Sequence, residues 1–285
     1  MEFWVTQTFN GLSYAALLFL IAGGFTLIFG VMRVVNITQG AFFLIGGYIG
    51  YTIIAMKGNF YVAFLMACIT VCLLGMTIER FFIRDVAGND LRMMLMTMGI
   101  ALFLQDLCLV IWGGDPLNLT VPAWLSRVFR IGNFYFSSLR IFMILSGMML
   151  FIVLWGFERK TRVGQIVRAA IDNAEMAEAL GINVSLVRLG VFGLGAILTA
   201  FGGVIGCAFM SVYPGLDFEF LPFAFVVVIL GGRGSLPGAL VGAIVVGFID
   251  NFGKALFPSV SYFTIFAPMA IMLAFRPKGL LGRGD

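Results

Sequence analysis

Three residues with amide or hydroxyl side chains interrupt a hydrophobic sequence near position 36. Asn36, Thr38 and Gln39 lie in the run 33–40, between two strongly apolar stretches. These side chains can donate and accept hydrogen bonds while remaining neutral. In a membrane, an unwound segment persists only where it is buried in protein or lines a wet cavity, and a broken helix there would direct backbone groups at a solute. An ordinary turn outside the membrane is an equal alternative.

A second interruption, 230–239, contains four glycines, a serine and a proline. Glycine frees the backbone for positive φ, and proline removes a donor and starts the next helix. Glycine-rich backbone beside a helix N-terminus is a candidate site for a carboxylate. It is not a dinucleotide fingerprint, because the strand before G-x-G-x-x-G is missing. The first interruption is framed by Gly30-x-x-Arg33 and Gly40-Ala41, and the second contains Gly-Gly-Arg at 231–233 and Gly-Ala at 238–239. This echo indicates either a weak internal repeat or two unrelated loops.

The third candidate is an alanine-rich run inside the charged segment 158–188. Its Ala, Glu, Met and Leu residues predict a short helix that Gly181 ends. Mostly small residues recur on one face at helical spacing: Ile166, Ala169, Ala170, Asn173, Ala177 and Leu180. Such a face suits docking into a groove on another protein. The alternative, a helix resting on lipid headgroups, would bring Asp172, Glu175 and Glu178 against an anionic leaflet, so we favour docking.

Acidic residues inside apolar segments are candidates for ion coupling. Asp106 is the only acid that the sequence places deep inside a span. Asp250 and Lys254 are four residues apart, which predicts an ion pair on a helix face. Asp217 and Glu219 fall in a predicted outer turn, where both would be solvated.

Several reaction centres are excluded by what the sequence lacks. It has no histidine, which excludes a Ser-His-Asp triad, a Cys-His dyad and a histidine-ligated zinc. Cys68 and Cys72 lie on one apolar helix face and are interpreted as core residues. No GxxxxGK[ST] loop is present for ATP. We therefore predict no catalytic residue, no metal and no cofactor on this chain.

The composition defines the solvent in which these residues are positioned. Of 285 residues, 61% are hydrophobic and 11% are charged, whereas soluble domains carry about 25% charged residues. The mean hydropathy is +1.06. A soluble core cannot bury this much apolar surface. Lipid is therefore the main solvent, and soluble enzymes, nucleic-acid binders and secreted disulfide scaffolds are excluded.

A membrane-spanning helix needs about 20 apolar residues, and this criterion predicts an all-α transmembrane bundle. We expect a single domain, 1–285, with about 8–10 spans, broken or re-entrant helices and a short cytoplasmic coupling helix. The candidate spans are 11–32, 41–56, 60–78, 93–112, 141–157, 189–212, 220–231, 237–257 and 262–275. Of these, 41–56, 220–231 and 262–275 are short and are either tilted or incomplete crossings.

Basic residues indicate the orientation. Lys and Arg concentrate in 80–92, in 158–188 and in the tail from Arg276. The positive-inside rule therefore places these segments, Arg33, Arg233 and the C-terminus in the cytoplasm, and the N-terminus outside. The outer stretch 113–140 is rich in aromatic residues and is interpreted as an amphipathic or re-entrant segment at headgroup depth.

Taken together, these motifs resemble the LivH-type permease subunit of bacterial branched-chain amino acid ABC importers. The family's Asn-x-x-Gln/His-Gly-x-Phe motif is matched from Asn36 to Phe42, and its Gly-Gly-x-Gly-Ser-x-x-Gly-Ala motif from Gly231 to Ala239. The run 164–182 and the tail 276–282 also resemble the family. Gln39 stands where many relatives carry His; it keeps hydrogen-bonding capacity but removes a titrating group.

The resemblance implies an inner-membrane permease that forms a heterodimer with a second, LivM-type permease subunit. Two cytoplasmic ATPase subunits, which bind ATP and magnesium, would dock on the inner loops of this pair, and a periplasmic binding protein would deliver the solute. The chain itself would not be an enzyme. The expected pathway residues are Asn36, Thr38, Gln39, Gly40, Phe42, Gly231, Gly232, Gly234 and Ser235, with Phe225 as a further apolar wall. The expected docking residues are Gly164, Arg168, Asp172, Asn173, Glu175, Ala177, Leu180 and Gly181.

Three alternatives remain open at this point. The same machine could carry another small solute, such as an aromatic acid, urea or an amide. Asp106 and the two interrupted segments would also suit an ion-coupled secondary transporter. A structural subunit without its own pathway would tolerate changes at Asn36 and Gln39.

Overall fold

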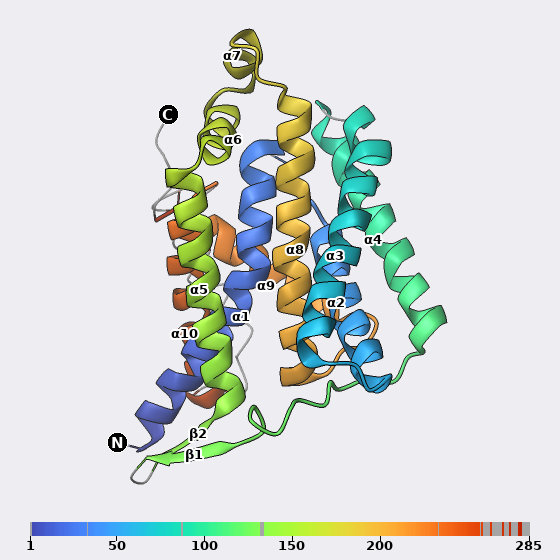
Figure 1. The fold of residues 1–285 in the computed structure, drawn as a ribbon. Coiled ribbons are helices and arrows are strands. Elements are labelled where there is room, and N and C mark those ends of the chain that lie inside the picture. Colours follow the sequence, from blue (N-terminus) through green and yellow to red (C-terminus); the bar gives the residue numbers. More distant parts are fainter. Residues whose placement is uncertain are drawn as a thin grey trace.

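The fold is dominated by α-helices in the part of the chain that the structure describes (Figure 1). This computed structural model describes residues 2–32, 34–86, 88–131, 134–232 and 234–256, together with 258, 263, 270, 274, 279 and 280. Its α-helices are α1 (Glu2–Met32), α2 (Thr38–Ala55), α3 (Phe60–Ile78), α4 (Asp90–Trp112), α5 (Ser138–Lys160), α6 (Arg162–Asp172), α7 (Ala174–Ala179), α8 (Val184–Met210), α9 (Leu216–Gly231) and α10 (Leu236–Leu256). A π-helical turn η1 (Glu79–Ile83) and a 3₁₀ turn η2 (Arg84–Val86) follow α3, and β1 (Val128–Ile131) pairs antiparallel with β2 (Phe134–Ser137).

Seven helices of the described residues are long and apolar enough to cross a membrane: α1, α2, α3 with its extension to Val86, α4, α5, α8 and α10. This confirms the all-α polytopic fold. The predicted short segment 220–231 is part of α9, which has 16 residues and is not among the seven. The candidate span 262–275 lies outside the described residues, apart from positions 263, 270 and 274.

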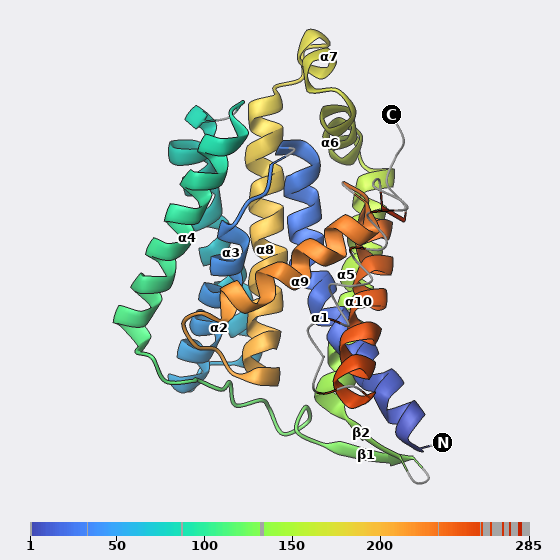
Figure 2. The same cartoon turned by 180° about the vertical axis from the view of Figure 1, so that it is seen from behind.

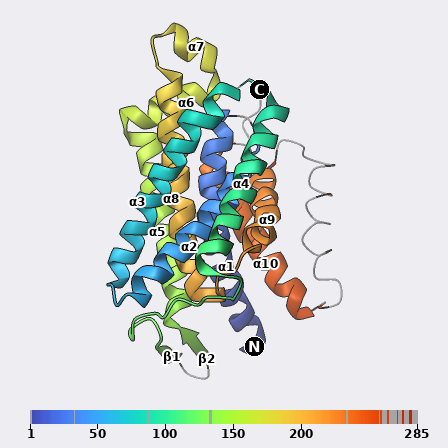
Figure 3. The same cartoon turned by 90° about the vertical axis from the view of Figure 1, so that its right-hand side faces the viewer.

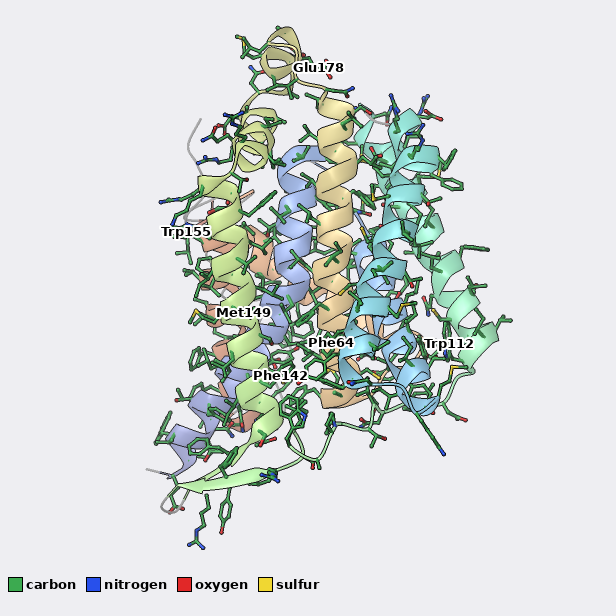
Figure 4. All side chains as sticks on the ribbon, viewed as in Figure 1. Phe64, Trp112, Phe142, Met149, Trp155 and Glu178 are labelled. Carbon is green, nitrogen blue, oxygen red and sulfur yellow. The ribbon has the colours of Figure 1, made fainter. Side chains whose placement is uncertain are left out.

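The bundle has a buried centre and an apolar periphery. The most apolar stretch of α1 is 89% buried and that of α8 is 78% buried, whereas those of α4 and α5 are each 22% buried. The outer helices present large apolar side chains outward, such as Met149 of α5 (Figure 4). Leu145 of the same helix is 62% exposed. An apolar outer face is what a lipid environment requires, so the central pair α1 and α8 is the scaffold for any interior site.

The two ends of the bundle carry different structures (Figure 3). One end, here called the hairpin end, carries the N-terminus and the hairpin β1–β2. Segment 113–127 leads to that hairpin across the end of the bundle and does not re-enter it (Figure 1), so the re-entrant interpretation of 113–140 is wrong. Its contacts explain the path, because Leu117 pairs with Val212 in an isolated antiparallel bridge beyond the end of α8.

The opposite end, here called the α7 end, carries α7 above the start of α8 and α6 beside the first turns of α8 (Figure 1). The sequence predicted one short helix here, whereas the structure contains two. Asn173 ends α6 and its side chain accepts a hydrogen bond from the Met176 N–H, so the residue starts a second helix as an N-cap. Gly181 follows the last turn of α7 with φ +84°, as the prediction of a helix-ending glycine requires.

Candidate functional site

The chain breaks between α1 and α2 inside the bundle. Residues 34–37 are not helical, yet Asn36 is 2% exposed and Gln39, in the first turn of α2, is 1% exposed. A solvated turn would leave such side chains accessible. The geometry therefore favours the buried, unwound segment over an ordinary turn. Arg33, which was expected to face the cytoplasm here, lies outside the described residues.

Asn36 organises the start of α2. Its Oδ1 accepts hydrogen bonds from the Thr38 N–H at 3.1 Å and from the Thr38 hydroxyl at 2.6 Å. This i to i+2 pattern is an Asx-turn that leads into α2 one residue before its N-cap, Ile37. The amide nitrogen Nδ2 is buried and has no partner among the described residues, so a hydrogen-bond donor is left available inside the bundle.

Gln39 connects α2 to the centre of the bundle. The Thr199 hydroxyl of α8 donates to Gln39 Oε1 and also lies 3.0 Å from the Gly195 carbonyl oxygen. A Cβ placed on Gly24 of α1 would lie 2.7 Å from Thr199 Oγ1, so α1, α2 and α8 all meet at this hydroxyl. Gln39 Nε2 has no partner among the described residues. A second buried donor is therefore available.

Asp217 adds a carboxylate to this region. The sequence placed it in a solvated turn, and that prediction is wrong: Asp217 lies in the first turn of α9 and is 2% exposed. A Cβ added to Gly40 would lie 3.2 Å from Asp217 Cβ, so the first turns of α2 and α9 pack together. Asp217 Oδ1 is buried without a hydrogen-bond partner among the described residues. Its position in the first turn, where the helix dipole favours a negative charge, was a signal the sequence analysis did not use.

Asn36, Gln39, Thr199 and Asp217 are here called the polar cluster. A buried polar group without a partner costs about 1–3 kcal/mol, and the cluster leaves two amide nitrogens and one carboxylate oxygen unpaired. Two helix N-termini, those of α2 and α9, converge beside it and favour negative charge. The cluster can therefore offer donors to a carboxylate and an acceptor to an ammonium group.

The glycine-rich interruption lies elsewhere. It joins the last turn of α9 to α10, whereas the polar cluster meets the first turn of α9 (Figure 2). At 1.5 Å per residue, the 16 residues of α9 separate these regions by roughly 22 Å. Gly234 lies against the end of α1, where a Cβ added to Gly30 would be 3.1 Å from Gly234 Cα. That Gly231 to Ser235 lie opposite or near Asn36 and Gln39 on a solute path stays a prediction.

Local structure accounts for the residues of this turn, which is here called the glycine turn. Gly232 and Gly234 have φ values of +99° and +70°, which side chains rarely adopt. Gly231 lies against the backbone of Gly238 with no room for a Cβ. Ser235 Oγ accepts a hydrogen bond from the Gly238 N–H at 3.1 Å and so caps α10. The predicted carboxylate site at this helix start is thus filled by the chain's own serine.

The tail also contacts the glycine turn. The Leu280 N–H donates to the Leu230 carbonyl oxygen at 2.7 Å, which satisfies one of the carbonyls that a helix end leaves unpaired. Arg233, Arg276 and Lys278, which were expected to lie in the cytoplasm, are outside the described residues.

The expected apolar walls belong to the core packing. Phe42 is fully buried, and its ring meets that of Phe192 edge to face at 5.9 Å between centroids. Phe225 is partly buried and meets Phe25 of α1 in the same manner at 4.8 Å. Their role along a solute path stays a prediction.

The other acids separate into three cases. Asp250 and Lys254 form the predicted ion pair, with 2.8 Å between Oδ2 and Nζ. Asp106 is exposed on α4. Glu79, which the sequence analysis missed, is 1% exposed in the π-helical turn. Among the described residues, no group of three or more Cys, Asp or Glu side chains could hold a metal ion.

The expected docking residues divide by exposure. Gly164 and Ala177 are buried against their own chain, and Arg168 is partly buried. Asp172, Asn173, Glu175, Leu180 and Gly181 are exposed. Ala177 packs with Ala170 and Val184, so part of the predicted face covers this chain and not a partner. Leu180 is 75% exposed, and Met176, one turn earlier and not singled out from the sequence, is 59% exposed.

The fold and the polar cluster define a polytopic membrane protein with a buried, hydrogen-bonding interior. Residues 7–275 match the family described as "Branched-chain amino acid transport system / permease component". The chain belongs to this family, which the sequence motifs had indicated.

Curated relatives cover almost the whole chain. It is 31% identical to the high-affinity branched-chain amino acid transport system permease protein BraD of Pseudomonas aeruginosa and 29% identical to LivH of Escherichia coli K12, each over 99% of this chain and 97% of the relative. It is 26% identical to the ribose import permease protein RbsC of Escherichia coli K12, over 95% of this chain and 85% of that one. A solved structure, PsaBC from Streptococcus pneumoniae in complex with Fab, is 14% identical with a TM-score of 0.50, covering 93% of this chain and 89% of that chain. It supports the fold alone.

Proposed function

We propose that this chain is the membrane permease subunit of an ATP-driven importer of branched-chain or related hydrophobic amino acids. The observation that carries the proposal is the 31% identity, over 99% of the chain, to a permease of a branched-chain amino acid system. The polar cluster supports the solute class, because amide donors and a carboxylate together match the charges of a zwitterion. Asn36, Thr38, Gln39 and Gly40 are the proposed pathway residues, now joined by Asp217.

The α7 end is the proposed docking surface for two ATPase subunits. Met176 of α7 and Leu180, the C-cap residue of this helix, are four residues apart and both are exposed. Large apolar side chains exposed at an aqueous end of a bundle are typical of a protein contact. Arg168, Asp172, Asn173, Glu175 and Gly181 would complete the surface. The ATPase subunits would bind ATP and magnesium, so this chain needs no cofactor of its own.

With this assignment we also propose the remaining partners and the orientation. The α7 end and the C-terminus would face the cytoplasm of a bacterial inner membrane, and the hairpin end and the N-terminus would face the periplasm. A solute-binding protein would dock at the hairpin end. A second, homologous permease subunit would complete the translocation path.

The test is uptake of radiolabelled leucine into proteoliposomes that contain the complete complex and its binding protein. We expect saturable uptake that needs ATP and persists when proton and sodium gradients are collapsed. Leu180→Asp should lower uptake at least tenfold while the chain still inserts. Leu91→Asp places the same charge on a 68% exposed leucine in the first turn of α4, at the same end but outside the proposed docking residues, and should leave uptake within twofold.

Uptake without the ATPase subunits, or its loss on collapsing the ion gradients, would overturn the proposal in favour of an ion-coupled transporter. A second candidate is the same machine carrying another solute, and the similarity to a ribose permease supports it. Competition of leucine uptake by ribose, an aromatic acid and urea separates the two. Leucine should be displaced by isoleucine and valine and by none of these three.

A further inference from the structure

A cavity lies at the α7 end, apart from the polar cluster. Its volume is ≈ 160 Å³, and four parts of the chain line it: the end of α1, the turn before α4 together with its start, α7, and the first turns of α8. The lining residues are Val31, Met32, Gly88, Met93, Ala174, Glu178, Val184 and Arg188. A cavity of about 150 Å³ is large enough to bind benzene, so this one can take a small organic molecule.

Two opposite charges face the cavity without pairing. Arg188 of α8 has a buried Nε with no hydrogen-bond partner among the described residues. Glu178 of α7 lines another side and is exposed (Figure 4). No ion pair joins the two in the described part of the chain, where Lys254 and Asp250 form the one salt bridge. A molecule that carries both charges could satisfy both residues.

Glu79 lies in η1, which packs against α8, the helix of Arg188. This carboxylate is 1% exposed, and its Oε1 has no hydrogen-bond partner among the described residues. It lies in a π-helical turn, a rare geometry that is frequent at functional sites. A buried carboxylate behind Arg188 offsets part of its charge. Together with Glu178, it makes the cavity unfavourable for a phosphate or another multiply charged anion.

The remaining lining is apolar. Val31, Met32, Met93 and Val184 surround the charged groups, and Met93 is almost completely buried. Small-molecule sites typically combine such a lining with a few convergent polar groups. Methionine side chains adapt to ligands of different shape. The site therefore suits a short branched hydrocarbon attached to a zwitterion.

We propose that this cavity binds a zwitterionic amino acid with an apolar side chain from the cytoplasm, with its carboxylate on Arg188 and its ammonium group on Glu178. The choice of leucine as the ligand rests on the proposed function. The bound molecule would bridge α7 to α1, α4 and α8. Since α7 has only six residues and packs on its own chain through Ala177 and Val184, the ligand would hold the proposed ATPase-docking helix in place and let the imported product restrain its own uptake.

The test is equilibrium binding of radiolabelled leucine to the full chain in lipid nanodiscs, with its partner permease. Arg188→Gln and Glu178→Gln should each weaken binding at least tenfold. Unlabelled 4-methylpentanoate, which lacks the ammonium group, and 3-methylbutylamine, which lacks the carboxylate, should each compete at least tenfold less well than leucine. Arg162→Gln and Asp85→Asn, exposed charges at the same end, should keep the affinity within twofold.

Glu178 is at the surface, so its variant keeps the result interpretable if Arg188→Gln fails to fold. Absence of saturable binding, unchanged affinity in Glu178→Gln, or competition by inorganic phosphate or 4-methylpentanoate as strong as by leucine would each overturn the inference. The uptake assay reports the proposed function separately. Leucine import together with unchanged leucine binding in Glu178→Gln would refute this site alone. Import of a different solute would refute the proposed function, and the effects of Arg188→Gln and Glu178→Gln on leucine binding would then test the cavity by themselves.

Discussion

The first polar interruption of the sequence packs against the start of α9, and the second follows the end of this helix. The two regions differ in how far their buried polar groups are paired by hydrogen bonds. At the glycine turn, Ser235 caps α10 and Leu280 pairs with the last turn of α9. At the polar cluster, Asn36 Nδ2, Gln39 Nε2 and Asp217 Oδ1 have no partner among the described residues. Buried polar groups are nearly always paired in folded proteins. The difference indicates that the glycine turn is built for structure and the polar cluster for a ligand.

The largest effect is expected at Asp217. Asp217→Asn keeps the shape of the side chain but removes its charge, and a hydrogen bond to a charged group is worth about 1.5–3 kcal/mol. We expect kcat/KM for leucine uptake to fall about 10- to 100-fold, measured in proteoliposomes. Glu219→Gln is the matched control, because Glu219 is exposed and accepts a hydrogen bond from the Tyr213 hydroxyl at 2.9 Å. Equal losses in both variants would remove the distinction between the buried and the exposed acid.

A smaller effect is expected at Gln39. Gln39→Leu removes the unpaired donor and the acceptor of Thr199, and a neutral hydrogen bond contributes about 0.5–1.5 kcal/mol. The KM for leucine should rise about 3- to 10-fold, with ATP hydrolysis still stimulated by the binding protein. Gln7→Leu, a partly buried glutamine near the start of α1, should change KM by less than twofold. An unchanged KM in Gln39→Leu would favour a structural subunit without its own path.

The smallest effect on transport is expected at Ser235. Ser235→Ala removes the cap of α10 and should lower the free energy of unfolding by about 1 kcal/mol, measured as a shift in thermal unfolding in detergent. Since the glycine turn is satisfied by its own chain, the KM for leucine should stay within twofold. A rise in KM comparable to that of Gln39→Leu would place both ends of α9 on the solute path. It would refute the distinction between a structural glycine turn and a ligand-binding polar cluster.

The sequence was sufficient for the class of fold. It singled out Asn36 and Gln39 but left two equal alternatives, because a polar run between apolar spans must be buried or lie outside the membrane. The burial of both side chains favours the first. The sequence misplaced Asp217, since the chain returns into the bundle after α8 and starts α9 there, and that path depends on packing with Gly40. It also treated Ala177 as a docking residue. Helical spacing identifies a face but not its occupant, and here the occupant includes Val184 of the same chain.

The hydrogen bond from Leu280 to Leu230 has a consequence for biosynthesis. The carbonyl group of Leu230, in the last turn of α9, is paired with Leu280, a residue that the ribosome adds some 50 positions later. Until then the Leu230 carbonyl oxygen must accept hydrogen bonds from water or lipid headgroups. The end of α9 therefore gains this hydrogen bond only after translation has passed codon 280. A nonsense mutation just before codon 280 would yield a shortened chain that still contains every described span. This chain would lack the hydrogen bond from Leu280 to Leu230, and we expect membrane quality-control proteases to degrade it.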